Sequence, residues 1–375
     1  MEEELVVLAE HSYERALVLK SRLEGEGIDV VLSNVNLLQP DASAGVRVKV
    51  RKSDLERAMK VYVDFLAEVG EDPAGEEERR AKNKGIRKIL VPVDLSEPSR
   101  HAALFAMLFA SHVGAEVLLL HAYYAPDMQT LPYDETFGFQ GTLTEYLTDL
   151  RETARRETQA FLKELKKEAA KEGAGKVKSD YFIVKGSLDD AVFYAGESYG
   201  PDLIVLGARG RDRRRNDPIG SMAARIIEKA DVPVWVVPEE ATFRQFLEEK
   251  EILYATNYDE ADFVAVRRLM QWIEPFGKEI LCVHFTRQRE DEEEKVKMEG
   301  LLRYFREACP ALRIRCRIIE GEDVVAGLDD FVTSHPVAAI AMTTHRRSLI
   351  EKLFFPSIAK KMFFHTRLPL LVFHS

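Results

Sequence analysis

Four small residues near the middle of the chain have the types and spacing of a phosphate-binding site. Gly207 and Gly210 follow directly on the apolar segment 202–206, and Gly220 and Ser221 come after nine further residues. Glycine lets a backbone approach a ligand closely, and a helix N-terminus offers unpaired N–H groups to an anion. The pattern predicts a strand, a loop and a helix that bind phosphate together. Taken singly, the glycines could instead serve only tight turns.

Apolar segments that are typical of buried strands alternate with helical segments after Gly85. Strands are expected at 86–93, 115–121, 181–184, 202–206 and 233–237, and helices at 98–113, 144–171, 189–199 and 221–229. This alternation predicts a parallel sheet with helices on both faces. Ligands of such sheets bind at the carboxyl ends of the strands, where the glycine motif lies.

The chain then repeats itself. Asn257 follows Asp94, and His284 follows His121, by the same 163 positions; Pro369 follows Pro233 by 136 positions. The constant offsets predict a duplication, with the extra length of the first copy placed around 125–146. We call residues 85–238 the first repeat and residues 239–375 the second repeat.

The segment before the repeats has a different pattern. Residues 1–70 read as β-α-β-β-α, with a capping box at 53–56, which predicts a small α+β module. Residues 71–84 are charged and contain Pro73 and Gly75, which is typical of a linker.

Composition limits the classes of function. The formal net charge of −10 argues against a general nucleic-acid binder. No apolar stretch reaches the ~18 residues of a membrane span, and the acidic start lacks the pattern of a secretory signal. Cys282, Cys309 and Cys316 fit no zinc spacing and are expected to be reduced bystander thiols. We expect a soluble, cytoplasmic protein with no nucleic-acid or membrane partner.

The glycine spacing resembles the ATP-binding signature of the universal stress protein (UspA) family, and the surrounding segments 88–97, 118–123 and 230–238 resemble it too. The resemblance covers residues 85–238 and, more weakly, 250–375. It implies two open parallel five-stranded sheets of the adenine-nucleotide alpha-hydrolase-like (HUP) class. The first 70 residues resemble the putative prokaryotic signal-transducing domain, through Gly45–Val50 and Asp54–Ala58.

The resemblance also implies a set of nucleotide-binding residues. Asp94 would meet the adenosine moiety and Pro92 would form a wall of the adenine pocket, while Ala122 would contact adenine through its backbone. The ribose and phosphate side would be formed by Leu206, Gly207, Gly210, Gly220, Ser221 and Met222. The ligand would be ATP or AMP, and Mg²⁺ is a candidate companion because nucleotide phosphates usually carry it. Asp94 could instead cap the following helix.

Arginines crowd the loop between Gly210 and Gly220, at positions 211 and 213–215. One or two of them could clamp the β- and γ-phosphates, or the loop could simply be a solvated basic segment. Pro218 would break the short helix that family members usually have here.

The second repeat departs from the motif. The positions that match Gly207, Gly210 and Gly220 are Thr343, Arg346 and Pro356, and only Ser357 is retained. The side chains of Thr343 and Arg346 would keep the backbone away from a phosphate. Pro356 lacks the backbone N–H that would donate a hydrogen bond to it. We therefore expect the second repeat to bind ATP poorly or not at all.

Both repeats end in a short apolar strand that follows a proline. An unpaired apolar edge strand invites association, and a tandem chain can pair its two edges within one molecule. We expect 233–237 to pair with 369–373 as an intramolecular pseudo-dimer. A further homodimer and an unknown protein partner stay open.

The leading hypothesis is a nucleotide-binding stress-response regulator that is not an enzyme. Slow ATP hydrolysis or nucleotidyl transfer is the first alternative, although no Glu or His has the spacing of a base near the γ-phosphate. A scaffold that works without nucleotide is the second alternative.

Overall fold

The computed structural model describes residues 4–11, 13–33, 46–69, 85–125, 138–209, 220–258, 260–286, 292–308, 313–320, 324–344 and 367–374. The chain divides into two compact units. One holds residues 85–248 and 363–372, and the other holds residues 1–84, 249–362 and 373–375. The expected linker at 71–84 lies outside the described residues.

The first repeat has five parallel strands in the order β6-β5-β4-β7-β8. They are β4 (Lys88–Val93), β5 (Glu116–Tyr123), β6 (Ser179–Lys185), β7 (Leu203–Gly207) and β8 (Val234–Val237). All residues of β8, and all of β7 except Gly207, are buried. Such continuous apolar strands are typical of a sheet that helices cover on both faces.

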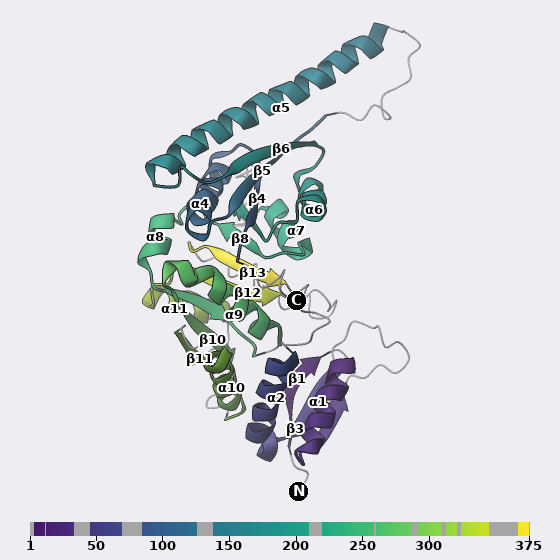
Figure 1. The fold of residues 1–375 in the computed structure, drawn as a ribbon, viewed down its shortest axis with the longest axis vertical. Coiled ribbons are helices and arrows are strands. Elements are labelled where there is room, and N and C mark those ends of the chain that lie inside the picture. The colour runs from purple at the N-terminus through teal and green to yellow at the C-terminus, as the bar shows by residue number, and fades with distance from the viewer. Residues whose placement is uncertain are drawn as a thin grey trace. The chain divides into compact units, whose positions relative to one another are not determined.

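Helices cover both faces of this sheet (Figure 1). On one face lie α4 (Glu97–Val113) and α5 (Gly138–Lys171), and on the other lie α6 (Leu188–Tyr199) and α7 (Ser221–Lys229). The short helix α8 (Phe243–Glu248) places Phe243 and Phe246 against Phe105 of α4. These rings and Trp235 of β8 form an aromatic core.

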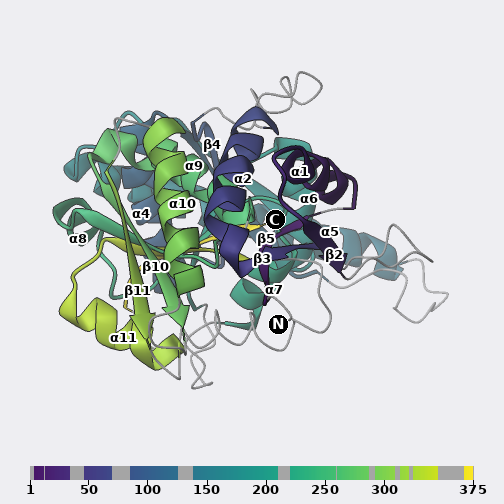
Figure 2. The ribbon, with the colours of Figure 1, turned by 90° about the horizontal axis from the view of Figure 1, so that it is seen from below.

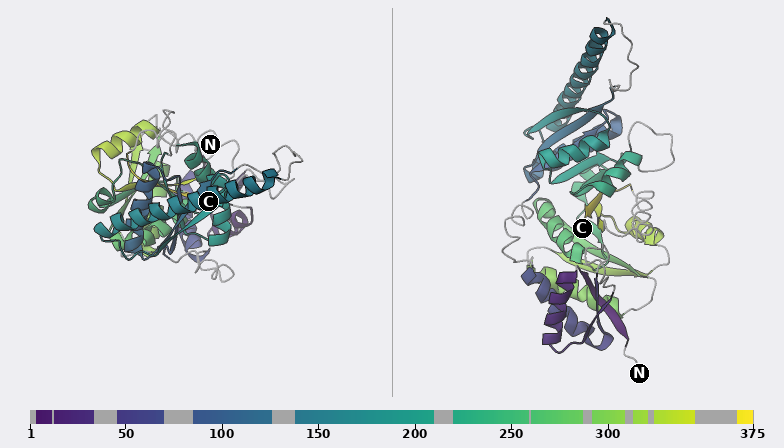
Figure 3. Two further views of the ribbon diagram at one scale, coloured as in Figure 1. Left: turned by 90° about the horizontal axis from the view of Figure 1, so that it is seen from above. Right: turned by 90° about the vertical axis from the view of Figure 1, so that its right-hand side faces the viewer.

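Helix α5 is longer than the predicted helix at 144–171, because it begins at Gly138. Its amino-terminal half extends beyond the sheet of the first repeat (Figures 1 and 3). The extension falls in the region around 125–146 where the first repeat was expected to hold its extra residues, although 126–137 lie outside the described part.

The second repeat uses the same strand order. Its parallel strands run β11-β10-β9-β12, and β13 comes next. Their bounds are β9 (Glu251–Ala255), β10 (Glu279–Thr286), β11 (Ile314–Glu320), β12 (Ala339–Thr344) and β13 (Leu370–His374). The helices are α9 (Glu260–Ile273), the 3-10 helix η4 (Glu274–Phe276), α10 (Glu292–Ala308) and α11 (Val324–Ser334).

Strand β13 adds a sixth strand to the sheet of the first repeat. Residues 370–372 pair antiparallel with β8, in the register Leu370 with Val236 and Val372 with Val234. These are the two strands that the sequence analysis expected to meet. The expected α/β class with two largely parallel sheets is confirmed, and the first sheet has six strands rather than five because β8 gains this neighbour.

The amino-terminal module is a three-stranded antiparallel sheet with two helices. The strand order is β1-β3-β2, with β1 (Leu5–His11), β2 (Val30–Ser33) and β3 (Val46–Arg51). The helices are α1 (Tyr13–Gly25) and α2 (Leu55–Val69). The expected capping box at 53–56 is not used as predicted, because the 3-10 turn η1 (Lys52–Asp54) precedes α2.

Helix α2 packs beside α10 within the same compact unit (Figure 2). The ring of Tyr62 contacts Phe263 edge-on, with centroids 6.3 Å apart. A Cβ at Gly300 would lie 2.5 Å from the Met59 side chain, so glycine permits this close approach. The module therefore packs on the second repeat rather than standing apart from it.

Candidate functional site

The carboxyl ends of β4, β5 and β7 bring most of the predicted site residues to one edge of the sheet. Val93 pairs with His121, which places Asp94 level with Ala122. Continuing the register of β4 and β7 places Pro92 level with Leu206. Pro92 and Leu206 are buried, whereas Asp94 and Ala122 are half-buried. The sheet register thus places Pro92, Asp94, Ala122 and Leu206 at the ends of neighbouring strands.

The helix of the motif begins where the sequence predicts. Helix α7 starts at Ser221 with Gly220 as its N-cap, and no side chain caps it by a hydrogen bond. The amide of Gly220 donates to the carbonyl of Ala208 at 2.9 Å, and the amide of Ala208 donates to Val237 at 3.1 Å. These bonds fix the start of α7 beside the end of β7, although Gly210 and 211–219 lie outside the described residues.

Gly207 has a packing role that the sequence analysis did not foresee. A Cβ there would lie 3.0 Å from the carbonyl oxygen of Pro98, in the first turn of α4. The glycine therefore lets α4 approach the end of β7 closely. This packing requirement and close approach by a ligand are compatible explanations of the same residue.

Asp94 makes local hydrogen bonds. Its Oδ1 accepts from the amide of Ser96 at 3.1 Å and also from the Ser96 hydroxyl. Ser96, rather than Asp94, is the N-cap of α4, since its Oγ accepts from the amide of Ser99. Between them, Leu95 has a φ of +60°, a left-handed conformation that is uncommon outside glycine. Asp94 thus holds the N-cap residue, which gives it a structural role beside the predicted contact with adenosine.

A buried polar network occupies the matching place in the second repeat. Thr343, at the position of Gly207, hydrogen-bonds through Oγ1 with the Tyr254 hydroxyl at 2.6 Å. That hydroxyl also donates to Oδ1 of Asp262 at 2.8 Å. The other carboxylate oxygen of Asp262 accepts from the Thr256 hydroxyl at 2.9 Å and the Asn257 amide at 2.8 Å.

Aromatic side chains gather at the carboxyl ends of β9 and β10 in the second repeat. Phe285 takes the position of Ala122, and its ring lies 3.3 Å from where a Cβ of Gly327 would be. The ring of Tyr258 lies 4.6 Å from that of His284. Tyr258 has a φ of +63°, matching Leu95. Of the three motif positions that differ, Thr343 is described, and Arg346 and Pro356 lie outside the described residues.

The sequence pattern does not reveal this network, because the hydrogen bonds between Tyr254, Asp262 and Thr343 join three separate elements. Each residue alone has an ordinary strand or helix pattern. A usable signal was present: the duplication aligns Tyr254 with Val91 and Asp262 with Ser99, and both changes add polar groups to buried positions.

Within the described residues, no cluster of three or more His, Cys, Asp or Glu side chains could hold a metal ion. None of the described helices combines the length and the apolar content that crossing a bilayer requires. In the register of β10 and β11, Cys282 lies beside Cys316, and the interaction with the Cys316 thiol, together with burial, raises the pKa of Cys282. That buried thiol is poorly suited to act as a nucleophile.

Comparison with known proteins identifies the first repeat. Residues 85–238 match the model of the Universal stress protein family. Universal stress protein MJ0577 of Methanocaldococcus jannaschii is 28% identical over 158 residues, which cover 40% of this chain and 94% of that protein. Universal stress protein MJ0531 of the same organism is 29% identical over 151 residues, covering 40% of this chain and 81% of that protein.

The crystal structure of a universal stress protein from Archaeoglobus fulgidus covers 76% of this chain and 96% of its own, with a TM-score of 0.53 and 16% identity. That likeness extends the shared fold beyond the first repeat. Residues 85–238 are therefore a domain of the universal stress protein family.

Proposed function

We propose that the first repeat binds an adenine nucleotide, ATP or AMP, and that the chain is a nucleotide-dependent regulator. The observation that carries this proposal is the start of α7. Gly220 leaves the first turn of α7 without a side-chain cap, and its hydrogen bond to Ala208 fixes that turn beside the end of β7. Uncapped N–H groups and the positive end of the helix dipole favour a phosphate.

The other proposed contacts follow from the resemblance to the universal stress protein family, and the sheet register is consistent with them. Asp94 and Ala122 would meet the adenosine part, while Gly207, Gly220, Ser221 and Met222 would lie on the phosphate side. Pro92 and Leu206 would form apolar walls, and Gly210 would complete the loop. Mg²⁺ would be held mainly by the phosphates.

The second repeat would be a structural partner that does not bind nucleotide. Thr343 and Phe285 put side chains where the first repeat has Gly207 and Ala122. The antiparallel pairing of residues 370–372 with β8 supports the intramolecular pseudo-dimer.

The test is isothermal titration of ATP and of AMP into the intact chain and into Ser221→Asp. The new carboxylate would repel phosphate at the start of α7. It would also interact favourably with the positive end of the helix dipole, so the variant should still fold. Ser221→Ala is the matched control, because it removes the hydroxyl without adding charge.

We expect one site per chain, weakened at least ~10-fold by Ser221→Asp with no loss of thermal stability. Failure of the intact chain to bind either nucleotide would overturn the proposal and favour the nucleotide-independent scaffold. Two sites per chain would contradict the assignment of the second repeat if the second site persists in Lys250→Glu with Arg306→Glu, two cations far along the chain from Thr343. Phosphate released during incubation with ATP would point to the enzyme alternative.

A further inference from the structure

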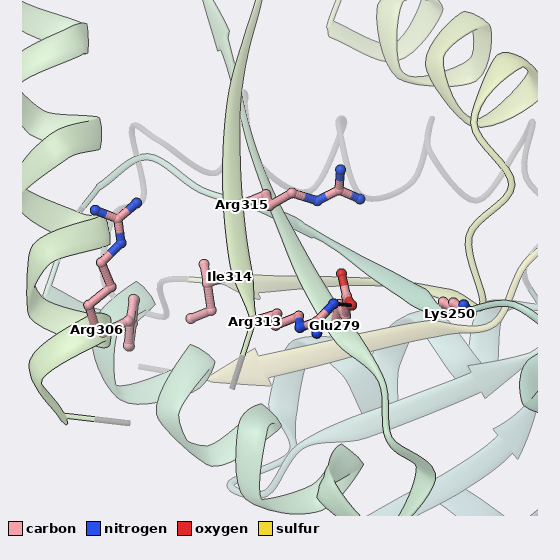
Figure 4. Close-up of a pocket in the computed structure, with 7 residues that line it drawn as sticks. Lys250, Glu279, Arg306, Arg313, Ile314 and Arg315 are labelled. Atoms are coloured by element: carbon pink, nitrogen blue, oxygen red, sulfur yellow. Dashed lines mark hydrogen bonds and ion pairs between the residues drawn. The ribbon is translucent and has the colours of Figure 1, made fainter. Parts of the chain in front are cut away.

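A basic pocket lies at the amino ends of β9, β10 and β11 in the second repeat, at the opposite end of those strands from the polar network. Its volume is about 610 Å³. Four cationic side chains line it, together with Glu279, Phe305 and Ile314. The cations are Lys250, Arg306, Arg313 and Arg315. They come from the ends of three elements, so the fold itself brings them together (Figure 4).

Carboxylates neutralise only part of this charge. Arg313 pairs with Glu279 at 3.3 Å, and Arg315 pairs with Glu251. No described carboxylate pairs with Lys250 or with Arg306, which is exposed at the end of α10. Figure 4 shows Ile314 between Arg306 on one side and Arg313 on the other. Two positive charges of the pocket lining, those of Lys250 and Arg306, are therefore not neutralised by a described carboxylate.

The matching place of the first repeat has a different arrangement of charges, since Arg87 corresponds to Lys250 and Lys88 corresponds to Glu251. The registers of β6 and β11 align Lys178 with Arg313 and Asp180 with Arg315. Lys178 pairs with Glu116 at 2.5 Å, as Arg313 does with Glu279, but Asp180 is a carboxylate where the second repeat has an arginine. One ion pair is thus common to both repeats, whereas the charge at Arg315 distinguishes the second.

We propose that this pocket binds a small phosphorylated molecule with at least two negative charges. Guanidinium groups bind phosphate oxygens in a bidentate manner, and two arginines line the pocket on either side of Ile314. The volume lies within the range of small-molecule sites, ~300–1,000 Å³. Because the chain as a whole has a net charge of −10, the four cations are not a sample of a generally basic surface. The proposal is independent of nucleotide binding by the first repeat.

The experiment uses the full chain with Ser221→Asp, so that the proposed nucleotide site does not contribute. Inorganic pyrophosphate is the probe. Its binding is measured by isothermal titration and by the change in the NMR methyl resonance of Ile314. The pocket variant is Lys250→Glu with Arg306→Glu. The matched control is Arg151→Glu with Lys163→Glu, two exposed cations of α5, which changes the net charge equally.

We expect one saturable site, a shift of the Ile314 resonance, and at least ~10-fold weaker binding by the pocket variant only. Thermal melting of both variants checks that they fold. Equal loss in the control variant would mean that net charge alone is responsible, and undiminished binding by the pocket variant would place the site elsewhere. Absence of saturable binding would also overturn the proposal. Equal binding of a tetraglutamate peptide would contradict the assignment to phosphate.

Discussion

At the end of β7 the first repeat has Gly207, and at the matching end of β12 the second repeat has Thr343. Around Gly207 the backbone of α4 comes within 3.0 Å of a potential Cβ, and the uncapped start of α7 lies beside the strand end. Around Thr343, hydroxyl groups and the carboxylate of Asp262 form hydrogen bonds with one another. The same strand order is therefore compatible with an uncapped helix start beside the strand end of the first repeat. In the second repeat it is compatible with polar side chains that hydrogen-bond to one another.

On the proposed function, this difference teaches how a duplicated strand end can be closed to a ligand while the fold is kept. Groups that would have faced a ligand need partners once they are buried, because an unpaired buried polar group is costly. The second repeat supplies those partners from Tyr254, Thr256 and Asn257. Four predictions test this comparison.

The largest effect is expected for Asp262→Ala compared with Ser99→Ala, the matching position. Removal of Asp262 takes the carboxylate acceptor from the buried hydroxyls of Tyr254 and Thr256 and from the part-buried Asn257 amide, which should cost ~3 kcal/mol. Ser99 donates one bond, to the carbonyl of Ser96 at 3.0 Å, and its loss should cost ~1 kcal/mol. Hydrogen exchange of β9 and β4 amides measures each repeat separately. Equal effects would contradict the role given to the network.

The second prediction concerns Lys278, whose counterpart is Ala115. Burial lowers the pKa of Lys278 from 10.5 to about 8. The unfolded chain then binds more protons than the folded one between about pH 8 and 10.5, so stability should rise with pH across that window. Lys278→Met should abolish the rise and stabilise the second repeat at pH 7 by ~1–3 kcal/mol.

The fluorescence of Trp272, in a Trp235→Phe background, follows unfolding of the second repeat alone, since the chain has only these two tryptophans. Lys163→Met is the exposed control and should leave the pH dependence unchanged. A persistent rise in Lys278→Met would show that another group titrates.

The third prediction exchanges the two strand-end residues. Gly207→Thr should destabilise the first repeat by ~1–3 kcal/mol, because its Cβ would crowd Pro98. It should also weaken ATP binding. Thr343→Gly should cost only ~1 kcal/mol, since the Tyr254 hydroxyl keeps Asp262 as a partner. Urea unfolding of single-tryptophan variants measures both. ATP binding restored by Thr343→Gly alone would contradict the view that several residues closed this site.

The smallest effects are expected for the ion pair that the repeats share. The ion pair with Lys178 lowers the pKa of Glu116, but Lys178 is largely exposed. Glu116→Gln and Glu279→Gln should each cost less than ~1 kcal/mol. Glu116→Gln should cost slightly more, because Glu116 also accepts from the Tyr199 hydroxyl at 3.2 Å. Thermal melting in low and high salt measures the electrostatic part, and a larger effect of Glu279→Gln would reverse the expected order.

The sequence predicted the strands of the first repeat well, because buried parallel strands are short apolar segments that glycine, proline and charged residues separate. Helix α7 has the predicted bounds. Helix α5 begins at Gly138 rather than at Thr144, because no residue pattern in this segment marks one start over the other. Residues brought together across elements were harder to predict. The packing of Gly207 on Pro98 and the bond between Tyr254 and Thr343 depend on register and helix approach, which a single sequence does not encode locally.

The pairing of residues 370–372 with β8 has a consequence for synthesis of the chain. Strand β8 leaves the ribosome long before its antiparallel neighbour, because residues 238–369 must be made in between. At ~5–20 residues per second, the apolar edge of β8 waits roughly 10 s for β13. During that interval a nascent first repeat exposes Val234–Val237 to other nascent chains. Chaperones that recognise short apolar strands should therefore meet this protein during translation, and a chain truncated before Leu370 should aggregate.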